Sequence, residues 1–307
     1  MNGVHHYEGS WRNEAPRVVG PTDLGFWSAN NVFDGARAIR GCAPDLDRHC
    51  ARLVRSAAAI GLQPALTGGQ VHDLCVEGVR MLPADADYYI RPMFFCRGGD
   101  ILPETGETQF ALSIFEMPMP PDNAGRATLS PFRRAAPDQA PTDAKAGALY
   151  PNSQRARREA MSRGFRLAVV LDPDGNVAEF SHANLWIAKD GVAITPKANG
   201  TFLDGITKNR VAGLLEAAGV AVEQRTLTVA DLDGADEIWM TGNAGKVQAV
   251  TGWEGRDLQP GPLFRQARAL YWAFVETCRI VDLSVGLGIR AQDTAAQRTA
   301  AQRTAIA

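Results

Sequence analysis

The sequence predicts an α+β fold in two parts. Its 307 residues exceed the usual size of one domain, and the stretch Pro118 to Gly125, rich in proline and turn-forming residues, is the best linker candidate. Strand and helix patterns occur on both sides of this stretch, but neither side alternates them strictly, as a doubly wound sheet would. The motifs GxGxxG and GxxxxGK[ST] are absent, which argues against dinucleotide-binding and P-loop folds.

The first part is predicted to hold two helices and at least two strands. A short strand in the region from Val18 leads to a helix that Asp45 to Asp47 can cap, and a second helix covers about 68–81. Strands are expected at 87–95 and 110–117. Pro92 lies within the first of these, where an edge or a bulge would suit it best.

The second part mixes more strands with three helices. A hairpin is expected where Lys189-Asp190-Gly191 separates two apolar runs, and Gly219 is expected to end a helix. The expected strands are 127–134, 165–172, 176–180, 185–188, 192–196, 221–229, 237–243 and 246–253, and the expected helices are 151–163, 207–218 and 262–275.

These patterns give a domain division. We expect a small N-terminal domain at 1–120, a linker at 121–128 and a larger domain at 129–283. The remaining residues, 284–307, contain a near-repeat of AAQRT with almost no large apolar side chain, so we expect them to be disordered.

Composition and charge argue against several kinds of partner. The formal net charge is −2 without long runs of like charge, so neither nucleic acid nor an anionic membrane is expected. No apolar segment could span a membrane and the first residues lack a signal core, so we expect a cytoplasmic protein. The five cysteines form no CxxC pair and the histidines no metal-binding spacing, so no metal site is expected.

Two ionisable residues stand in surroundings that suit catalysis. Lys145 lies between small residues in DAKAGALYPNS, which leaves room for a ring and favours a lowered lysine pKa. Glu179 lies in the mostly apolar NVAEFSHANLW, where a buried carboxylate needs a partner such as a pyridinium nitrogen. Each also fits a plain surface position.

The segment LDGITKNRV is typical of an anion seat. Gly205 allows close approach, and Ile206 and Thr207 would open a helix whose N–H groups face the anion. The plain alternative is a helix start capped by Asp204. Thr241-Gly242-Asn243 could add donors after a strand, and Arg52 could neutralise the same anion.

The order of these motifs resembles the class IV, or fold-type IV, pyridoxal 5′-phosphate (PLP) aminotransferases, and most of all the branched-chain amino acid aminotransferases. The similarity extends from about Phe26 to Val275. The segments that carry it are VFDGARA (32–38), DRHCARLVRSA (47–57), YIRP (89–92), AKAGALYPNS (144–153), NVAEFSHANLW (176–186), NGTFLDGITKNRV (199–211), DEIWMTGN (236–243) and LQPGP (258–262).

The resemblance implies a role for each matching residue. Lys145 would carry PLP as a Schiff base and move the substrate proton, Glu179 would hold the pyridine nitrogen protonated, and Tyr150 would bond the phenolic oxygen. The remaining cofactor-binding residues would be Arg52, Gly205, Ile206, Thr207, Thr241, Gly242 and Asn243, and those on the substrate side Phe33, Arg37, Tyr89, Arg91 and Ala244.

The resemblance also implies an architecture and a reaction. A smaller N-terminal α/β domain and a larger domain with a β-barrel-like core would enclose PLP between them. A homodimer is expected, because the family's active site borrows a loop from the neighbouring subunit. The reaction would be ping-pong transamination between an amino donor and a 2-oxo acid, with a branched-chain L-amino acid and 2-oxoglutarate as the leading pair.

Three departures from the family pattern affect the substrate half. The usual tyrosine-glycine pair is replaced in Trp27-Ser28-Ala29-Asn30, which would change one pocket wall. Asn243 replaces a common threonine, and the unusual Lys246 is expected to face solvent. Trp186 replaces the usual phenylalanine or tyrosine.

These departures keep alternatives open. An (R)-selective amine transaminase or a D-amino acid aminotransferase on the same scaffold is the first, and aminodeoxychorismate lyase the second. A non-catalytic PLP-binding protein is the third, although Lys145, Glu179 and Arg52 are all retained.

Overall fold

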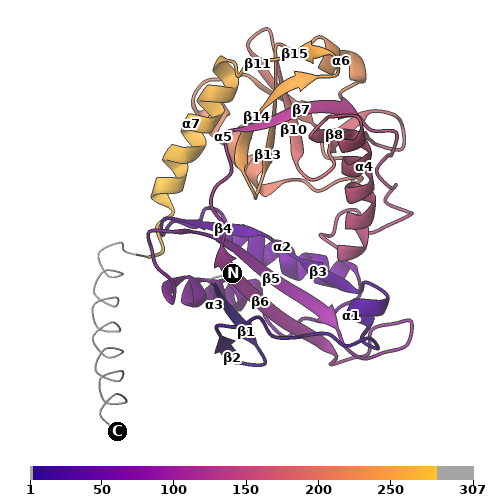
Figure 1. Ribbon diagram of the computed structural model, residues 1–307, viewed down its shortest axis with the longest axis vertical. Coiled ribbons are helices and arrows are strands. Elements are labelled where there is room, and N and C mark those ends of the chain that lie inside the picture. Colours follow the sequence, from indigo (N-terminus) through magenta and orange to yellow (C-terminus); the bar gives the residue numbers. More distant parts are fainter. Residues whose placement is uncertain (1–2, 282–307) are drawn as a thin grey trace.

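The structure of the protein, a computed structural model, describes residues 3–281 as two sheets with helices packed on them (Figure 1). The smaller sheet is antiparallel, in the order β2-β1-β6-β5-β3, with β4 also paired to β5. Its strands are β1 (Gly3–Tyr7), β2 (Ser10–Arg12), β3 (Asn31–Phe33), β4 (Ala36–Ile39), β5 (Asp87–Cys96) and β6 (Thr108–Glu116).

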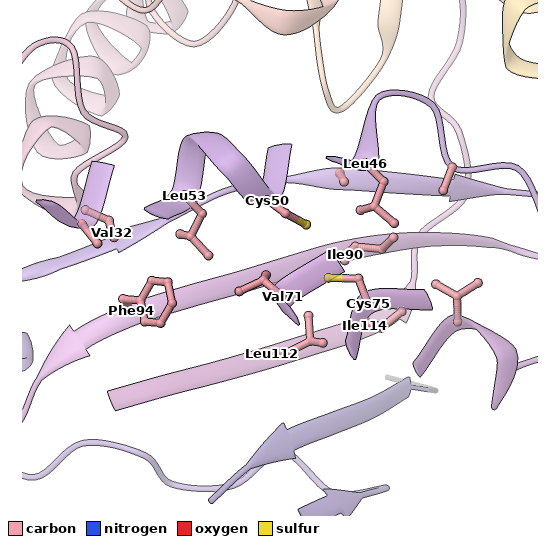
Figure 2. Close-up of a cluster of buried hydrophobic side chains, with 14 of the residues drawn as sticks. Val32, Leu46, Cys50, Leu53, Val71, Cys75, Ile90, Phe94, Leu112 and Ile114 are labelled. Atoms are coloured by element: carbon pink, nitrogen blue, oxygen red, sulfur yellow. The ribbon is translucent and has the colours of Figure 1, made fainter. Parts of the chain in front are cut away.

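Two helices cover one face of this sheet. α2 (Leu46–Ala59) lies on β3, β4 and β5, whereas α3 (Gly68–Arg80) lies on β5, β6 and β1. Figure 2 shows the core between them, which includes Val32, Leu46, Cys50, Leu53, Val71, Cys75, Ile90, Phe94, Leu112 and Ile114. A short helix, α1 (Leu24–Trp27), precedes β3. The hairpin of β1 and β2 was not predicted from the sequence.

Pro92 lies in the central strand β5, neither at an edge nor at a bulge. Its carbonyl accepts a hydrogen bond from the Asp34 N–H, so its nitrogen faces the gap where the partner of β5 changes from β4 to β3. The missing N–H therefore breaks no ladder hydrogen bond.

The larger sheet has nine strands in the order β12-β11-β10-β13-β14-β7-β8-β9, with β15 paired to β14. β9, at one end, packs against β10 and β11, so the sheet curls toward a barrel. Its strands are β7 (Asn123–Leu129), β8 (Leu167–Leu171), β9 (Val177–Phe180), β10 (Asn184–Lys189), β11 (Val192–Pro196), β12 (Val222–Arg225), β13 (Glu237–Gly242), β14 (Lys246–Trp253) and β15 (Arg256–Asp257).

The helices of this part stand around the sheet (Figure 1). They are the 3₁₀ turn η1 (Gly147–Leu149), α4 (Tyr150–Ser162), α5 (Ile206–Ala217), α6 (Val229–Asp233) and α7 (Pro262–Thr277). α6 was not predicted. Thr228 caps it through a reciprocal pair of hydrogen bonds with Asp231, so the strand expected at 221–229 ends early.

The expected linker at 121–128 is mostly the strand β7, so only residues 117–122 connect the two sheets. β7 pairs in parallel with both β8 and β14, and Gly125 (φ 94°) adapts it to a register irregularity in the pairing with β14. The division into two domains near this point stays a prediction. The expected disordered tail, 284–307, lies outside the described residues.

Further contacts join the two halves. Asp45 precedes α2 but does not cap it with its side chain; its carboxylate instead binds Arg210 of α5, at 2.5 Å from Nη2. Gly41 accepts hydrogen bonds from the N–H groups of Ile280 and Val281, after α7. Within residues 3–281, no helix is long and apolar enough to cross a membrane.

Candidate active site

A cavity of about 620 Å³ lies between the two sheets, and nearly all the predicted site residues line it. Its walls come from the smaller sheet and α2 on one side, and from β9, the β13–β14 turn and the starts of α4 and α5 on the other. The predicted residues in its wall are Phe33, Arg52, Tyr89, Arg91, Lys145, Tyr150, Glu179, Gly205, Ile206, Thr207, Thr241, Gly242, Asn243 and Ala244.

The backbone of Lys145 is held against the smaller half, at α2 and β3. Its N–H donates to Ser56 Oγ at 3.0 Å, and its carbonyl accepts from the Phe33 N–H. The side-chain amine reaches the cavity, with Nζ 2.5 Å from the Tyr150 hydroxyl. Burial, followed by repulsion from Arg52, lowers the pKa of Lys145, so the amine loses its proton more readily than an exposed lysine.

Tyr150 begins α4, with Pro151 in the first turn, where its missing N–H costs nothing. The ring packs against Phe33, with 4.8 Å between the centroids. Burial, reinforced by Asp34, raises the pKa of Tyr150 and keeps its hydroxyl protonated. A protonated phenol can donate to an anionic oxygen beside the Lys145 amine.

Glu179, on β9, is buried with a partner that the sequence analysis missed. Arg134 places Nη2 2.7 Å from one carboxylate oxygen, and Asn184 Nδ2 donates to the other at 3.1 Å. Burial raises the pKa of Glu179, while Arg134 opposes that rise. Arg134 lies in the irregular segment after β7, where the sequence carried no signal for it.

Arg52 is fixed by a second residue that was missed. Asp34, fully buried between β3 and β4, accepts from Arg52 Nε at 2.7 Å and Nη2 at 2.9 Å, and its Oδ1 lies 2.8 Å from His49 Nδ1. Burial alone would raise the pKa of Asp34, but Arg52 and His49 outweigh it and hold the pKa well below its usual range. The spacing of His49 and Arg52, on one face of α2, was the available signal.

The start of α5 is free to receive an anion. Gly205 is the N-cap and offers no side-chain cap, so the first N–H groups of the helix lack one. The alternative, a helix start capped by Asp204, is not what the structure shows, because the Asp204 carboxylate pairs with Lys208 at 2.7 Å. A Cβ on Gly205 would collide with Asn184, which explains the glycine.

The β13–β14 turn forms part of the cavity wall. Thr241 has its hydroxyl in the core, where it accepts from Trp186 Nε1 at 3.1 Å. Trp186 stacks on Trp239 and does not line the cavity. Gly242, Asn243 and Ala244 follow at the cavity wall.

The expectation that Lys246 faces solvent was wrong. Its side chain is 1 % exposed, and Nζ donates to Asn243 Oδ1 at 2.9 Å. Its backbone is left-handed (φ 62°) at the point where the turn re-enters β14, opposite Gly242. The ammonium group folds back under its own turn rather than pointing outward.

Aromatic rings surround a cation at the substrate side of the cavity. The Arg91 guanidinium carbon lies 5.0 Å from the centroid of the Tyr89 ring and 5.7 Å from that of Phe33. The ring of Phe115 stacks on that of Tyr89, with 5.6 Å between the centroids. This arrangement offers an apolar surface and a positive charge side by side.

Two of the substrate-side expectations are corrected. Arg37 is fully buried and lies outside the cavity wall, because its guanidinium reaches Met117, whose carbonyl accepts from Nη2 at 2.6 Å. The segment Trp27 to Asn30 does not line the cavity either, and Trp27 is 60 % exposed on α1. Among residues 3–281, no group of three or more histidine, cysteine or acidic side chains could hold a metal ion.

Comparison of the sequence with known proteins finds one family. The model of the family described as Amino-transferase class IV matches residues 31–253. A probable branched-chain-amino-acid aminotransferase of Aquifex aeolicus is 31% identical over 255 residues, which cover 78% of this chain and 82% of the relative. The branched-chain-amino-acid aminotransferase of Salmonella typhimurium is 32% identical over 243 residues, which cover 75% and 78% of the two chains.

Solved structures agree with the sequence relatives. An aminotransferase from Brucella abortus bound to the cofactor PLP has a TM-score of 0.88 and 42% identity, covering 89% of this chain and 99% of its own. A branched-chain aminotransferase from Thermoproteus uzoniensis with norvaline has a TM-score of 0.82 and 29% identity, covering 89% and 95%.

Proposed function

The chain belongs to the class IV aminotransferases, and we propose that it transfers the amino group of a branched-chain L-amino acid to 2-oxoglutarate in a ping-pong reaction. The cofactor is PLP, which the Brucella abortus relative binds. The observation that carries the proposal is the Lys145 amine, 2.5 Å from the Tyr150 hydroxyl in a cavity that Glu179 also lines.

The residues of the cavity fit PLP at each of its polar groups. Arg52, fixed by Asp34, and the uncapped start of α5 at Gly205 would hold the phosphate. Tyr150 would donate to the phenolic oxygen, and Glu179 would bind the ring nitrogen. Bound PLP supplies the carbonyl carbon that carries the amino group and a ring that withdraws electrons.

The side chains then perform the proton transfers. Lys145 would bind the cofactor through Nζ in the resting enzyme and, once released, take the proton from Cα of the amino donor. Its lowered pKa favours the neutral amine that this step needs. Glu179 is kept in place by Arg134 and Asn184, so its charge can stay fixed beside the ring nitrogen.

The substrate side supports both halves of the proposed reaction. A branched aliphatic side chain can pack on the rings of Phe33 and Tyr89. The second carboxylate of 2-oxoglutarate can pair with Arg91, which stands among those rings. One pocket can therefore take an apolar donor and an acidic acceptor in turn.

A second candidate is a transaminase for D-amino acids or (R)-amines. It is favoured by the position of Trp27 to Asn30. These residues lie outside the cavity, so they do not sterically exclude an amino donor of the opposite configuration. The scaffold, the cofactor and the role of Lys145 would be the same.

We further propose that the protein acts as a homodimer. Phe26 and Trp27 of α1 are 64 % and 60 % exposed, and Ile101 and Leu102 of the β5–β6 loop are 82 % and 77 % exposed. Gly99 of that loop lies against Leu24 of α1, so these large apolar side chains belong to neighbouring segments at one end of the smaller sheet. A second copy of the chain would cover them.

The test follows the absorbance of the holoenzyme when L-leucine, D-alanine or (R)-1-phenylethylamine is added separately. Bleaching by L-leucine that is reversed by 2-oxoglutarate is the expected result. Bleaching only by D-alanine or the (R)-amine would replace the proposed donor with the second candidate. Lys145→Ala should lose the response while Lys189→Ala, on the exposed end of β10, should keep it; a fully active Lys145→Ala would refute the assigned base.

A further inference from the structure

An ion pair joins the two helices that supply the proposed phosphate seat. Asp45, at the start of α2, accepts from Arg210 of α5, whose Nη2 lies 2.5 Å and whose Nε lies 3.1 Å from Oδ1. The Asp45 side chain is 2 % exposed and that of Arg210 is 26 % exposed, so the pair is largely withdrawn from water. Neither the family resemblance nor the proposed reaction gives this pair a role.

The backbone of Asp45 adopts a conformation that is rare for a residue with a side chain. Its φ is 54°, in the left-handed region, which costs free energy for any residue with a Cβ. An aspartate at this position could cap α2, but its side chain accepts no hydrogen bond from the helix backbone. The carboxylate contacts Arg210 of the other half instead, so the strained residue serves the joint between the halves.

Arg210 is held in turn by α7. Its guanidinium carbon lies 4.1 Å from the centroid of the Phe274 ring, which is close enough for a cation to be attracted to the ring face. Just after α7, the Cys278 carbonyl accepts from the Ala43 N–H at 2.9 Å, two residues before Asp45. Both members of the pair are therefore anchored at the same joint.

The pair lies on the helix faces that also carry cavity residues. On α2, Asp45, His49 and Arg52 are four and three residues apart, which places them on one face. On α5, Thr207 and Arg210 are three residues apart and share a face in the same way. Since Arg52 and Thr207 line the cavity, the ion pair stands behind them, about 10 Å along α2 from Arg52 and about 5 Å along α5 from Thr207.

A phosphate that is bound from two sides needs those sides at a fixed spacing. Arg52 belongs to the smaller half, whereas the first N–H groups of α5 belong to the larger one. Binding groups must be held to within about 0.5 Å of the productive geometry for a site to work well. The Asp45–Arg210 pair links the two helices directly and close to the seat, so it can hold that spacing.

We propose that Asp45 and Arg210 are a positioning pair that sets the spacing between Arg52 and the first turn of α5, and with it the affinity for the phosphate of PLP. The inference rests on the proposed function, which places the phosphate at these two elements. Neither Asp45 nor Arg210 lines the cavity, so neither touches the cofactor. Both act through the helices that carry them.

The test titrates the full chain, freed of cofactor, with PLP and with pyridoxal, which carries a hydroxyl where PLP carries the phosphate. Each dissociation constant is measured from the absorbance of the ligand. Asp45→Asn removes the charge and keeps a residue that tolerates the left-handed backbone, whereas Arg210→Met removes the cation and keeps an apolar side chain against Phe274. Each change should weaken PLP about tenfold and pyridoxal about twofold or less.

Arg48→Met is the matched control. Arg48 Nε also approaches Asp45 Oδ1, at 3.7 Å, but this exposed side chain belongs to α2 itself and so does not join the halves. Its removal should leave both dissociation constants within about twofold of wild type. Arg210→Lys, which keeps a cation opposite Asp45, should restore most of the affinity for PLP that Arg210→Met loses.

The ratio of the two affinities separates positioning from plain stabilisation. A pair that only stabilised the fold would lower the Tm of the cofactor-free protein and would weaken PLP and pyridoxal equally, and that result would overturn the proposal. The double variant Asp45→Asn with Arg210→Met should weaken PLP no more than either single change, because both remove the same interaction. Losses that add in the double variant would also overturn it.

The two proposals can fail separately. A wild-type holoenzyme that is not bleached by L-leucine refutes the proposed donor, whereas the affinities for PLP and pyridoxal can still be compared. A wild-type protein that binds PLP no more tightly than pyridoxal refutes the placement of the phosphate, and the inference with it. If Asp45→Asn does not fold, Arg210→Met carries the test, because Arg210 is the more exposed partner. Unchanged PLP affinity in folded Arg210→Met refutes the inference.

Discussion

Replacing Asp34 by asparagine should damage both stability and cofactor binding. The carboxylate is fully buried and accepts two hydrogen bonds from Arg52, whose side chain is itself only 12% exposed. Asparagine keeps the size but removes the charge, which leaves Arg52 as a nearly buried cation without its counterion. Breaking a buried pair in this way costs about 3 kcal/mol, which corresponds to a fall of about 5 °C in Tm for a chain of this size.

The loss of the Asp34–Arg52 ion pair should also weaken the binding of PLP. Arg52 without Asp34 is no longer fixed for the phosphate, so PLP should bind about tenfold more weakly. Thermal unfolding of the PLP-free protein and titration of that protein with PLP measure the two effects separately. Asp73→Asn, at an exposed aspartate of α3, is the control and should change Tm by about 1 °C or less.

The pH dependence of stability follows from the pKa of Asp34. The folded pKa lies well below the unfolded value of about 3.9, so the stabilisation is present above that value and is lost as pH falls through the folded pKa. The part of the difference between wild type and Asp34→Asn that comes from the titration of Asp34 itself should therefore be constant from pH 8 to pH 5. The difference should widen as pH falls through the pKa of His49, because burial lowers that pKa and Asp34 opposes the fall only in the wild type. An equal Tm and an equal PLP affinity in the two proteins would refute the reasoning.

Three further predictions concern Glu179, its partner Arg134, and the exposed apolar side chains of the β5–β6 loop. Glu179→Gln should keep PLP but slow the half-reaction by orders of magnitude, because a neutral amide cannot hold the ring nitrogen protonated; stopped-flow absorbance with an unchanged rate would exclude this role. Arg134→Met removes the 2.7 Å ion pair, so the pKa of Glu179, already raised by burial, should rise further and the half-reaction rate should recover only at higher pH. Ile101→Asp combined with Leu102→Asp should give monomers in light scattering, whereas Met161→Asp, on α4, should not; dimers in all variants would place the interface elsewhere.

The fold was predictable where patterns were long. The α+β class with a barrel-like larger sheet is confirmed by the structure and its neighbours, and the main helices and strands were placed to within a few residues. The elements that were not predicted are short or have an unusual composition. The hairpin of β1 and β2 and the helix α6 are too brief for a periodic signal. The first half of β7 was assigned to the linker because NAGRATL begins with small residues, and the strand was expected only from residue 127.

The site was predictable through its motifs rather than its contacts. The family is confirmed, and all the expected residues except Arg37 line one cavity. Asp34 and Arg134 were missed because nothing local marks a side chain whose partner lies in another element: Asp34, between β3 and β4, meets Arg52 of α2, and Arg134, after β7, meets Glu179 of β9. Only the requirement that a buried charge has a partner predicts that such residues exist.

Lys246 shows why the remainder could not be predicted. A lysine in a short polar turn indicates solvent, and the sequence gives no sign that its φ is positive. The left-handed backbone reverses the direction of the side chain, so the charge is brought against Arg37 and the amide of Asn243. A single positive φ angle therefore turns an expected surface side chain toward Asn243, which lines the cavity. Sequence patterns average over backbone conformations, so they do not reveal such an angle.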